Sequence, residues 1–523
     1  MTTTTPCINA VASAIRECRI KRITCVPGYP ITELAEHLMS ESGAGAGAGA
    51  GMNVEWCINE KVAMEIALGV SASGSRSMVI VKHVGMNILA DPLITASTHT
   101  TGAGVVVIAG DDPHATASQN EQDSRYWGLL AEVPVLDPNP ENLYDTIFEA
   151  YRISEAVCTP VIIRITDPLL QSGCVCRARG DPARNPPEPY LFDRSIWEYS
   201  TRGMYQLFHR DTYPLMNNLS ETSHLNVCAE GTNEIGDEAS CIISSGYVSG
   251  TVESILRQTE HITHITHLSL SFVSPLPLML IRDFIGDRRV LVIEETAPVI
   301  EQQLQLQSHK ILGRQSGHLP YGGIGEADIL SAIENIGKNK IALNTAPETL
   351  ESRGFTRSIC DDCPFVPVYE AIRSVKKETG ALIAGDMGCS IRTAPTGVVD
   401  LAYSLGGAIG IATGLPGKSI AVIGDYGLIH SGLQALIDAE SKGRDVLVIV
   451  LQNMVSAMTG GQEVLDPGRI LRACCNDVVT INEINGEHAI KQLITEKLGV
   501  RGVSVIVVHE TCRRCERLTN AQP

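Results

Sequence analysis

The chain has 523 residues, and its 41 lysines and arginines against 59 aspartates and glutamates give a formal net charge of −18. An acidic surface of this size repels phosphate backbones and disfavours a nucleic-acid-binding protein. Hydrophobic residues make up 44% of the sequence and charged residues 19%, which is a globular composition. At roughly 150 residues per domain, the length predicts about three domains, each with its own core.

Neither a targeting segment nor a membrane span is expected. The N-terminal residues are rich in threonine and lack the charged-then-apolar pattern of a secretory signal. No stretch approaches the about 18 to 20 consecutive apolar residues that a bilayer-spanning helix needs. Sixteen cysteines without such a signal favour free thiols in a reducing or anaerobic cytoplasm over a disulfide scaffold. We therefore expect a soluble, cytoplasmic protein.

The first block of the sequence, residues 6–178, alternates helical stretches with short runs rich in valine and isoleucine. The runs that we expect to be strands are residues 23–27, 77–81, 104–109 and 159–165. This alternation predicts a parallel sheet that is covered by helices on both faces. A proline-rich linker follows at residues 180–189.

Two further blocks carry the same alternation. The strands expected in the second block are residues 240–245, 265–271 and 290–295, and a helix is expected from about residue 297. The strands expected in the third are residues 382–385, 419–424, 446–452 and 503–509. The predicted fold class is α/β, with three doubly wound parallel-sheet domains. We place these domains at residues 1–178, 190–340 and 350–523.

Two polar residues in the third block follow successive predicted strands. One strand ends in Gly424 and Asp425, and the next ends in Asn453, 28 residues after Asp425. A strand–helix–strand crossover of this length places the carboxyl ends of both strands at the same sheet edge, where α/β folds bind ligands. One carboxylate and one amide oxygen suit Mg²⁺, which prefers oxygen ligands. The alternative is that Gly-Asp makes a turn and that Asn453 caps a helix.

A glycine-rich turn lies upstream of this pair. Residues 385–390, Gly-Asp-Met-Gly-Cys-Ser, end another apolar run, and a helix with glycines four residues apart is expected at residues 406–414. A glycine-rich turn that leads into a helix offers unpaired N–H groups to an anion such as a diphosphate. The helix itself suits close packing in a core better than pairing in a membrane.

Segments in all three blocks resemble those of a known family, the alpha subunits of indolepyruvate:ferredoxin oxidoreductases. These enzymes are thiamine-diphosphate-dependent 2-oxoacid:ferredoxin oxidoreductases. The segments that carry the resemblance are residues 27–33, 55–65, 82–87, 111–113, 118–126, 294–301, 319–322, 385–389, 424–432 and 452–462. The resemblance implies a pyrimidine-binding first domain, a middle domain like the C-terminal domain of transketolase, and a diphosphate-binding third domain. It covers nearly the whole chain.

The resemblance also implies a cofactor site in the third block. The residues implied to bind thiamine diphosphate are Gly385, Asp386, Gly388, Cys389, Ser390, Gly424, Asp425, Tyr426, Gly427, Asn453 and Val455. The side chains of Asp425 and Asn453 and the carbonyl of Val455 are implied to hold Mg²⁺.

Glu60 is the implied catalytic residue, because thiamine chemistry needs a carboxylate against N1′ of the cofactor's pyrimidine. It follows a predicted strand and opens a predicted helix, where an ordinary acidic residue would merely complement the helix dipole. His83 and His430 are candidates for proton transfer or for contact with the substrate carboxylate, and either histidine can equally be structural. The polar residues of a nearby loop are possible neighbours of the site: Asn120, Glu121 and Asp123.

Two differences from the family bear on function. Relatives continue into a ferredoxin-like domain with two four-iron clusters, whereas this sequence has only Cys512 and Cys515 near its end, so no iron–sulfur cluster is expected on this chain. The pair Cys360 and Cys363 lies 149 residues before Cys512, and the two pairs could form a zinc site only if the fold brought them together. Phe365 stands where relatives usually carry a histidine.

Three functional hypotheses remain. The favoured one is oxidative decarboxylation of an aryl 2-oxo acid to an acyl-coenzyme A, with electrons passing to ferredoxin through a smaller beta subunit and an iron–sulfur carrier. The second is a non-oxidative decarboxylase that releases an aldehyde, and the third is a non-catalytic partner that binds thiamine diphosphate. A dimer or a hetero-oligomer is expected, and indolepyruvate, phenylpyruvate and smaller 2-oxo acids are all compatible with the sequence.

Overall fold

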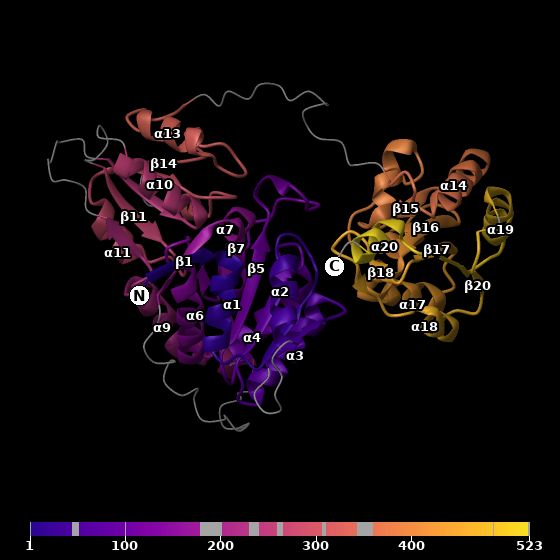
Figure 1. The fold of residues 1–523 in the computed structure, drawn as a ribbon, viewed down its shortest axis with the longest axis horizontal. Coiled ribbons are helices and arrows are strands. Elements are labelled where there is room, and N and C mark those ends of the chain that lie inside the picture. Colours follow the sequence, from indigo (N-terminus) through magenta and orange to yellow (C-terminus); the bar gives the residue numbers. More distant parts are fainter. Residues whose placement is uncertain are drawn as a thin grey trace. The chain divides into compact units, whose positions relative to one another are not determined.

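The computed structural model describes residues 2–43, 52–99, 101–177, 201–229, 240–258, 265–305, 310–341, 359–484 and 486–520. The chain divides into two compact units, Met1–Asn344 and Thr345–Pro523 (Figure 1). The predicted linker at residues 180–189 lies outside the described residues. Among the described helices, none combines the length and the hydropathy that a membrane-spanning helix requires.

The first unit contains a seven-stranded sheet in the order β12-β6-β7-β5-β4-β2-β3, parallel except for β12. Its strands are β2 Arg22–Cys25, β3 Asn53–Trp56, β4 Ser77–Lys82, β5 Val105–Asp111, β6 Val135–Leu136, β7 Val161–Thr166 and β12 Phe272–Ser274. Successive side chains of a strand point to opposite faces, so Met78 and Ile80 enter one core while Val79 and Val81 enter another. Both faces of the sheet are therefore buried, as predicted.

Helices cover both faces of this sheet. The helices are α1 Cys7–Glu17, α2 Thr32–Gly43, α3 Glu60–Ala72, α4 Met86–His99, α5 Tyr126–Ala131, α6 Leu143–Val157 and α7 Asp167–Gln171. The apolar residues of α1, α2 and α6 share one core with the sheet, and those of α3 and α4 share the other.

A second sheet lies in the same unit, with the order β14-β13-β10-β11-β9 and only β9 antiparallel. Its strands are β9 Val227–Ala229, β10 Ser240–Ser245, β11 Thr266–Leu270, β13 Arg289–Ile293 and β14 Ile311–Leu312. Its helices are α10 Tyr247–Gln258, α11 Leu278–Ile285, α12 Val299–Gln305 and α13 Glu326–Glu334, preceded in the chain by α8 Thr201–Leu207 and α9 Tyr213–Glu221. One core contains residues of both sheets.

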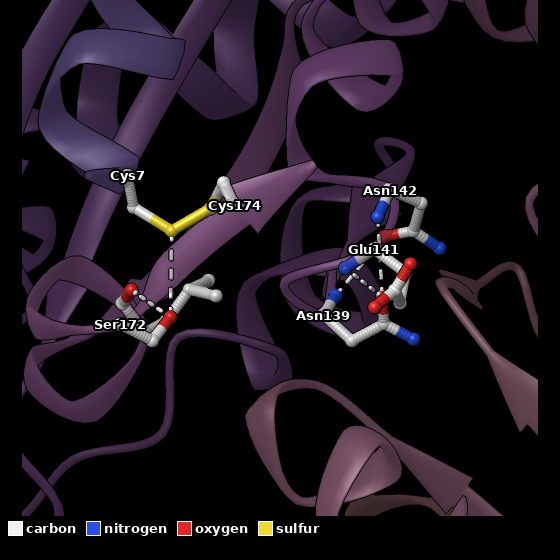
Figure 2. The surroundings of a disulfide bond; sticks show 7 residues. Cys7, Asn139, Glu141, Asn142, Ser172 and Cys174 are labelled. Carbon is white, nitrogen blue, oxygen red and sulfur yellow. Dashed lines mark hydrogen bonds between the residues drawn. A yellow bond between two sulfur atoms is a disulfide. The ribbon is translucent and has the colours of Figure 1, made fainter. Parts of the chain in front are cut away.

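The N-terminus of the chain pairs with a strand from the end of the first block. β1 (Thr2–Pro6) is antiparallel to β8 (Gly173–Arg177). Cys7, the first residue of α1, forms a disulfide with Cys174 of β8, and the hydroxyl of Ser172 lies 3.4 Å from Cys7 Sγ (Figure 2). The expectation of free thiols is therefore wrong for this pair, because β-pairing at the ends of the block brings the two cysteines together. The other described cysteines form no disulfide.

The second unit is built on five parallel strands in the order β15-β16-β17-β21-β20. They are β15 Ile383–Gly385, β16 Ser419–Gly424, β17 Val446–Gln452, β20 Val478–Ile481 and β21 Val503–His509. Helices α14 Val366–Thr379 and α19 Glu487–Gly499 cover one face; α15 Ala408–Thr413, α17 Leu433–Ser441 and α18 Gly468–Cys474 cover the other. The predicted α/β class with parallel sheets is confirmed.

Candidate active site

The glycine-rich turn and the Asp425–Asn453 pair of the second unit lie at one edge of its sheet. β15, β16 and β17 are neighbours in the sheet, and all three run in the same direction. Gly385 is the last residue of β15, Gly424 is the last of β16, and Asn453 follows Gln452 at the end of β17. The spacing argument that placed Asp425 beside Asn453 is borne out by this register.

Asp425 is buried, with 1% of its surface exposed, and it binds the chain that follows β17. Its Oδ2 accepts hydrogen bonds from the backbone N–H groups of Asn453 at 3.0 Å and Met454 at 2.6 Å, and its Oδ1 accepts one from Tyr426 at 2.9 Å. Burial raises the pKa of this carboxyl to about 6, although these N–H groups act in the opposite direction. The carboxylate thus lies in a desolvated place where a cation would favour its charged form.

Asn453 completes a turn with its own backbone. Its Oδ1 accepts a hydrogen bond of 3.1 Å from the N–H of Val455, and Met454 between them has a positive φ of 60°. The turn thus brings together one carboxylate and one amide oxygen, which are atoms of the kind that suits Mg²⁺. Among the described residues, no group of three or more histidines, cysteines, aspartates and glutamates is arranged to hold a metal ion. The residues fit a hard cation that also takes ligands from a phosphate and from water.

Asp386 follows β15 and is fully enclosed by the same edge. Its carboxylate accepts a hydrogen bond from the N–H of Gly406, and a Cβ atom at Gly427 would lie 3.0 Å from its Cγ. Gly406 has a φ of +78°, and a Cβ there would lie 2.8 Å from the carbonyl oxygen of Gly427. Burial raises the pKa of Asp386 to about 7. Glycine is thus needed at residues 406 and 427 because Asp386 and the backbone occupy the space of a side chain.

The remaining residues of the glycine-rich turn form its backbone frame. The hydroxyl of Ser390 accepts a hydrogen bond of 2.9 Å from the N–H of Asp386 and donates one of 3.0 Å to the Asp386 carbonyl. Gly388 precedes a short 3₁₀ helix that begins at Cys389. The turn is therefore closed by Ser390, the second residue of this helix.

His430 lies in a π-helical turn, Leu428–Gly432, between Asp425–Gly427 (α16) and α17. Such turns are rare and frequently occur at functional sites. The imidazole is buried, its Nδ1 lies 3.1 Å from Ser431 Oγ, and its ring centroid is 5.7 Å from that of Tyr426. Its charge would lower the pKa of Asp386, so the histidine is within electrostatic reach of the carboxyl at the predicted cofactor edge.

The two C-x2-C pairs of the second unit lie near each other. The thiols of Cys360, Cys389 and Cys512 all contribute to raising the pKa of Cys363, although burial is the largest cause. The fold therefore meets the condition on which a zinc site depended. The described cysteines nevertheless form no metal-holding group of three, and burial raises the pKa of Cys363 and of Cys389, which favours their protonated thiols.

Glu60 is the first residue of α3 in the first unit, with only 4% of its surface exposed. Asn59 caps the helix, since its side chain accepts a hydrogen bond of 3.0 Å from the N–H of Val62. The side chain of Glu60 lies over Gly85, where a Cβ atom would be 2.7 Å from Glu60 Cγ. Glu60 is therefore packed into the turn that follows β4, rather than lying in solvent as a common first-turn glutamate does.

His83 lies in that turn and is completely buried. Its Nδ1 is 3.2 Å from the carbonyl oxygen of Gly110, and its Nε2 is 3.1 Å from the carbonyl oxygen of Asn120. A neutral imidazole has a single N–H, so the ring donates a hydrogen bond to one of these two carbonyls, and it lies between the end of β5 and the loop that follows. Proton transfer by His83 stays a prediction, and the contacts that are visible are structural ones.

The loop residues Asn120, Glu121 and Asp123 have different surroundings. Asp123 is buried beside Arg125, and its Oδ2 lies 2.6 Å from Arg125 Nη2. Burial alone would raise the pKa of this carboxyl, but the charges of Arg125 and Arg164 outweigh it, so the pKa lies below the usual value. Glu121 Oε1 accepts a hydrogen bond of 2.7 Å from the N–H of His114. Asp123 is therefore part of a buried ion network and not of a solvated loop.

One charged residue at the carboxyl edge of the first sheet was not predicted from the sequence. Lys82, the last residue of β4, has Glu60 and Asp112 as its electrostatic neighbours. A lysine that ends an otherwise apolar strand is a signal for such a position, because strand ends form the ligand-binding edge of a parallel sheet.

Comparisons with known proteins agree with the segments found above. Residues 387–508 match the family described as thiamine pyrophosphate enzyme, C-terminal TPP binding domain. Thiamine pyrophosphate is another name for thiamine diphosphate. The matched range includes Asp425, Asn453 and the helix between them.

Relatives are found over nearly the whole chain. The indolepyruvate oxidoreductase subunit IorA of Archaeoglobus fulgidus is 28% identical over 96% of this chain and 85% of its own length. IorA of Thermococcus kodakarensis is 29% identical over 96% of this chain and 84% of its own.

A solved structure shares the fold. The 2-oxoglutarate:ferredoxin oxidoreductase from Magnetococcus marinus, determined with 2-oxoglutarate, coenzyme A and succinyl-CoA bound, aligns with a TM-score of 0.51 and 14% identity. The alignment covers 64% of this chain and 65% of that one, so just under two thirds of each is compared. Over almost its full length the chain thus resembles the indolepyruvate oxidoreductase subunit IorA, and its second unit carries a match to the TPP-binding domain of thiamine pyrophosphate enzymes.

Proposed function

We propose that this chain is the thiamine-diphosphate-dependent subunit of a 2-oxoacid oxidoreductase that acts on aryl 2-oxo acids such as indolepyruvate. The observation that carries the proposal is its similarity to IorA over 96% of the chain. The buried Glu60 at the start of α3 and the buried Asp425 beside Asn453 support it, because each residue type suits its implied task.

The cofactor would be held by groups of the second unit. Asp425, Asn453 and the carbonyl of Val455 would bind Mg²⁺, and the glycine-rich turn from Gly385 to Ser390 would face the diphosphate. Thiamine diphosphate, when bound, supplies a carbon nucleophile and an electron sink for decarboxylation. Glu60 would hold a proton at N1′ of the pyrimidine.

The overall reaction balances with two electrons. A 2-oxo acid anion and coenzyme A give an acyl-coenzyme A, CO₂, one proton and two electrons. Ferredoxin would accept the electrons through a smaller beta subunit and an iron–sulfur carrier. The chain itself would bind the 2-oxo acid and position the carbon that loses CO₂.

Turnover under anaerobic conditions tests this proposal. The purified chain is supplied with thiamine diphosphate, Mg²⁺ and an arylpyruvate, with and without coenzyme A, a viologen dye and a co-expressed beta subunit. Acyl-coenzyme A formed together with reduced dye supports the proposal. Aldehyde formed by the chain alone, with no reduction of the dye, would instead identify a non-oxidative decarboxylase.

Replacing Glu60 tests the catalytic assignment. Glu60→Gln keeps the shape of the side chain but removes its proton transfer, so kcat should fall by about 10²- to 10⁴-fold while the cofactor still binds. The control is Glu65→Gln, because Glu65 lies on the same helix with an exposed carboxylate that pairs with Lys61. Turnover of Glu60→Gln within threefold of the wild type would refute the role of Glu60.

A further inference from the structure

Lys82 ends β4 at the carboxyl edge of the first sheet. β4 lies between β2 and β5, and the loops that follow all three strands meet at this edge. The turn after Lys82 carries Gly85, on which Glu60 is packed. Lys82 and Glu60 therefore belong to the same small region of the first unit.

The aliphatic part of Lys82 is held in place by packing. It lies against the backbone of Gly28, where a Cβ atom would be 2.5 Å from Lys82 Cδ and 2.8 Å from its Cγ. Any larger residue at position 28 would displace the lysine. The stem thus has a fixed path along the sheet edge, and the ammonium group is presented at its end.

The ammonium group is only partly satisfied. Its Nζ donates a hydrogen bond of 2.9 Å to Gln119 Oε1, and no carboxylate of the described residues forms an ion pair with it. Asp112 is near, but its carboxylate accepts hydrogen bonds from the N–H groups of Thr116 and Ala117. An ammonium group can donate three hydrogen bonds, so Lys82 has capacity left for an anion.

Partial burial strengthens the attraction between Lys82 and such an anion. Burial lowers the pKa of Lys82, while Glu60 and Asp112 act in the opposite direction. Lys82 is half-buried, whereas Arg125 and Arg164 are fully buried and are each paired with a carboxylate at 2.6 Å. A partly desolvated cation whose hydrogen-bond partner is neutral attracts an incoming anion more strongly than a cation that is already paired.

We propose that Lys82 binds the carboxylate of the 2-oxo acid, an inference that rests on the proposed function. The carboxylate is attached to the carbon that reacts with the cofactor, and Glu60 is the residue proposed to activate that cofactor, so the carboxylate and Glu60 belong to one site. The other anions of the reaction are farther from that carbon. The diphosphate is assigned to the second unit, and the phosphates of coenzyme A are remote from its thiol.

The chemistry gives this contact a kinetic signature. The negative charge leaves the carboxylate as the carbon–carbon bond breaks and neutral CO₂ forms. Lys82 therefore favours the bound substrate at least as much as the transition state, and its loss should raise KM more than it lowers kcat.

The test compares Lys82→Met, which keeps the stem, with Lys82→Arg, which keeps the charge, in the holoenzyme with its beta subunit. For Lys82→Met, KM for an arylpyruvate should rise by about 10- to 100-fold, the loss expected for a charged hydrogen bond. Lys82→Arg should recover most of that loss, and kcat of both variants should stay within about threefold of the wild type. The control is Lys21→Met, which removes an exposed lysine beside the start of β2, at the opposite edge.

Each of the other outcomes would contradict the assignment of Lys82 in a different way. An unchanged KM for the arylpyruvate, in Lys82→Met or in a second variant Lys82→Gln, would overturn the assignment. A rise in KM for coenzyme A alone would assign Lys82 to a phosphate, and a fall in kcat alone would make it a positioning residue for Glu60. If the wild type turns over no 2-oxo acid, the proposed function fails and this assignment fails with it.

Discussion

His267 of β11 is a buried titratable residue outside the predicted site, with 2% of its surface exposed. Its Nε2 lies 2.6 Å from Ser244 Oγ, and Ser244 donates its own hydrogen to Ser249 Oγ at 2.8 Å. Nε2 must therefore donate to Ser244, which leaves Nδ1 without a proton in the neutral ring. Burial lowers the pKa of His267 to about 4.

This histidine gives the first unit a pH dependence. The unfolded chain binds a proton at His267 near pH 6.5, whereas the folded chain does so only near pH 4. Above about pH 6.5 His267 is neutral in both the folded and the unfolded chain, and the free energy of unfolding is at its full value. As the pH falls from there towards 4, the free energy of unfolding decreases by roughly 1.4 kcal/mol per pH unit. His267→Gln should flatten this part of the curve of unfolding free energy against pH.

Urea unfolding at several pH values between 4 and 7.5 checks this prediction. His224→Gln is the control, because His224 is an exposed histidine of the same unit. A slope in His267→Gln as steep as that of the wild type would show that other groups cause the acid sensitivity.

At the scale of elements, the end of β17 depends on β16. Asp425 of α16, just after β16, accepts the N–H groups of Asn453 and Met454 and so holds the turn that carries the predicted metal ligands. Removing the carboxylate frees these N–H groups and takes away one oxygen ligand at once. The strand end should then lose its order together with its affinity for the cation.

Asp425→Ala should therefore weaken Mg²⁺-dependent binding of thiamine diphosphate by at least about tenfold, a loss of 1.4 kcal/mol or more. Calorimetric titration with Mg²⁺ and with EDTA measures it, and EDTA should abolish binding to the wild type. The control is Asp438→Ala, since Asp438 is exposed on α17 and its carboxylate pairs with Lys442. Equal affinity of Asp425→Ala and the wild type would place the metal elsewhere.

The elements that could be predicted from the sequence are those with long apolar runs. β4, β5, β16 and β17 were expected within a residue or two of their observed bounds, because a strand buried on both faces is continuously apolar. Strands of only two residues, such as β6 and β14, were missed, since so short a segment shows no periodicity. Pairing with a distant strand decides whether it is a strand at all.

The candidate site, too, could be predicted from the sequence only in part. The adjacency of Asp425 and Asn453 could be predicted because strand order and loop length determine it locally. Lys82 could not, since its position beside Glu60 depends on the packing of two loops and on the absence of a side chain at Gly28. The burial of Asp123 follows from contacts with residues more than a hundred positions later, which no local pattern encodes.

At the scale of the whole molecule, buried charges join the two sheets of the first unit. Arg125 donates hydrogen bonds to Glu294 at 2.8 Å and to Ser245 at 3.0 Å, and Arg164 donates one of 3.2 Å to Thr296. One apolar core also contains side chains of both sheets. Breaking such a network by removing one partner is costly, because a buried charge is left unpaired. The three predicted domains stay a prediction, but the first two blocks share one of their cores.

The second unit, by contrast, has cores of its own. Residues 345–523, produced alone, should therefore fold and unfold cooperatively. Residues 201–344 alone keep one core of their own but lose about half of the core that they share with the first sheet, so this fragment should unfold at a lower temperature than the first unit does. Circular dichroism and thermal unfolding of the two fragments check this. A 201–344 fragment as stable as the first unit, or an unfolded 345–523 fragment, would contradict the division into two units.

The disulfide between Cys7 and Cys174 turns most of the first block into a covalent ring. Every strand from β2 to β7 lies on this ring, and so do Glu60 and Lys82. A single cut in any loop between the two cysteines leaves both pieces attached to each other. New chain ends could therefore be opened in such a loop, for instance between α3 and β4, without separating the lysine and the glutamate from the rest of their sheet.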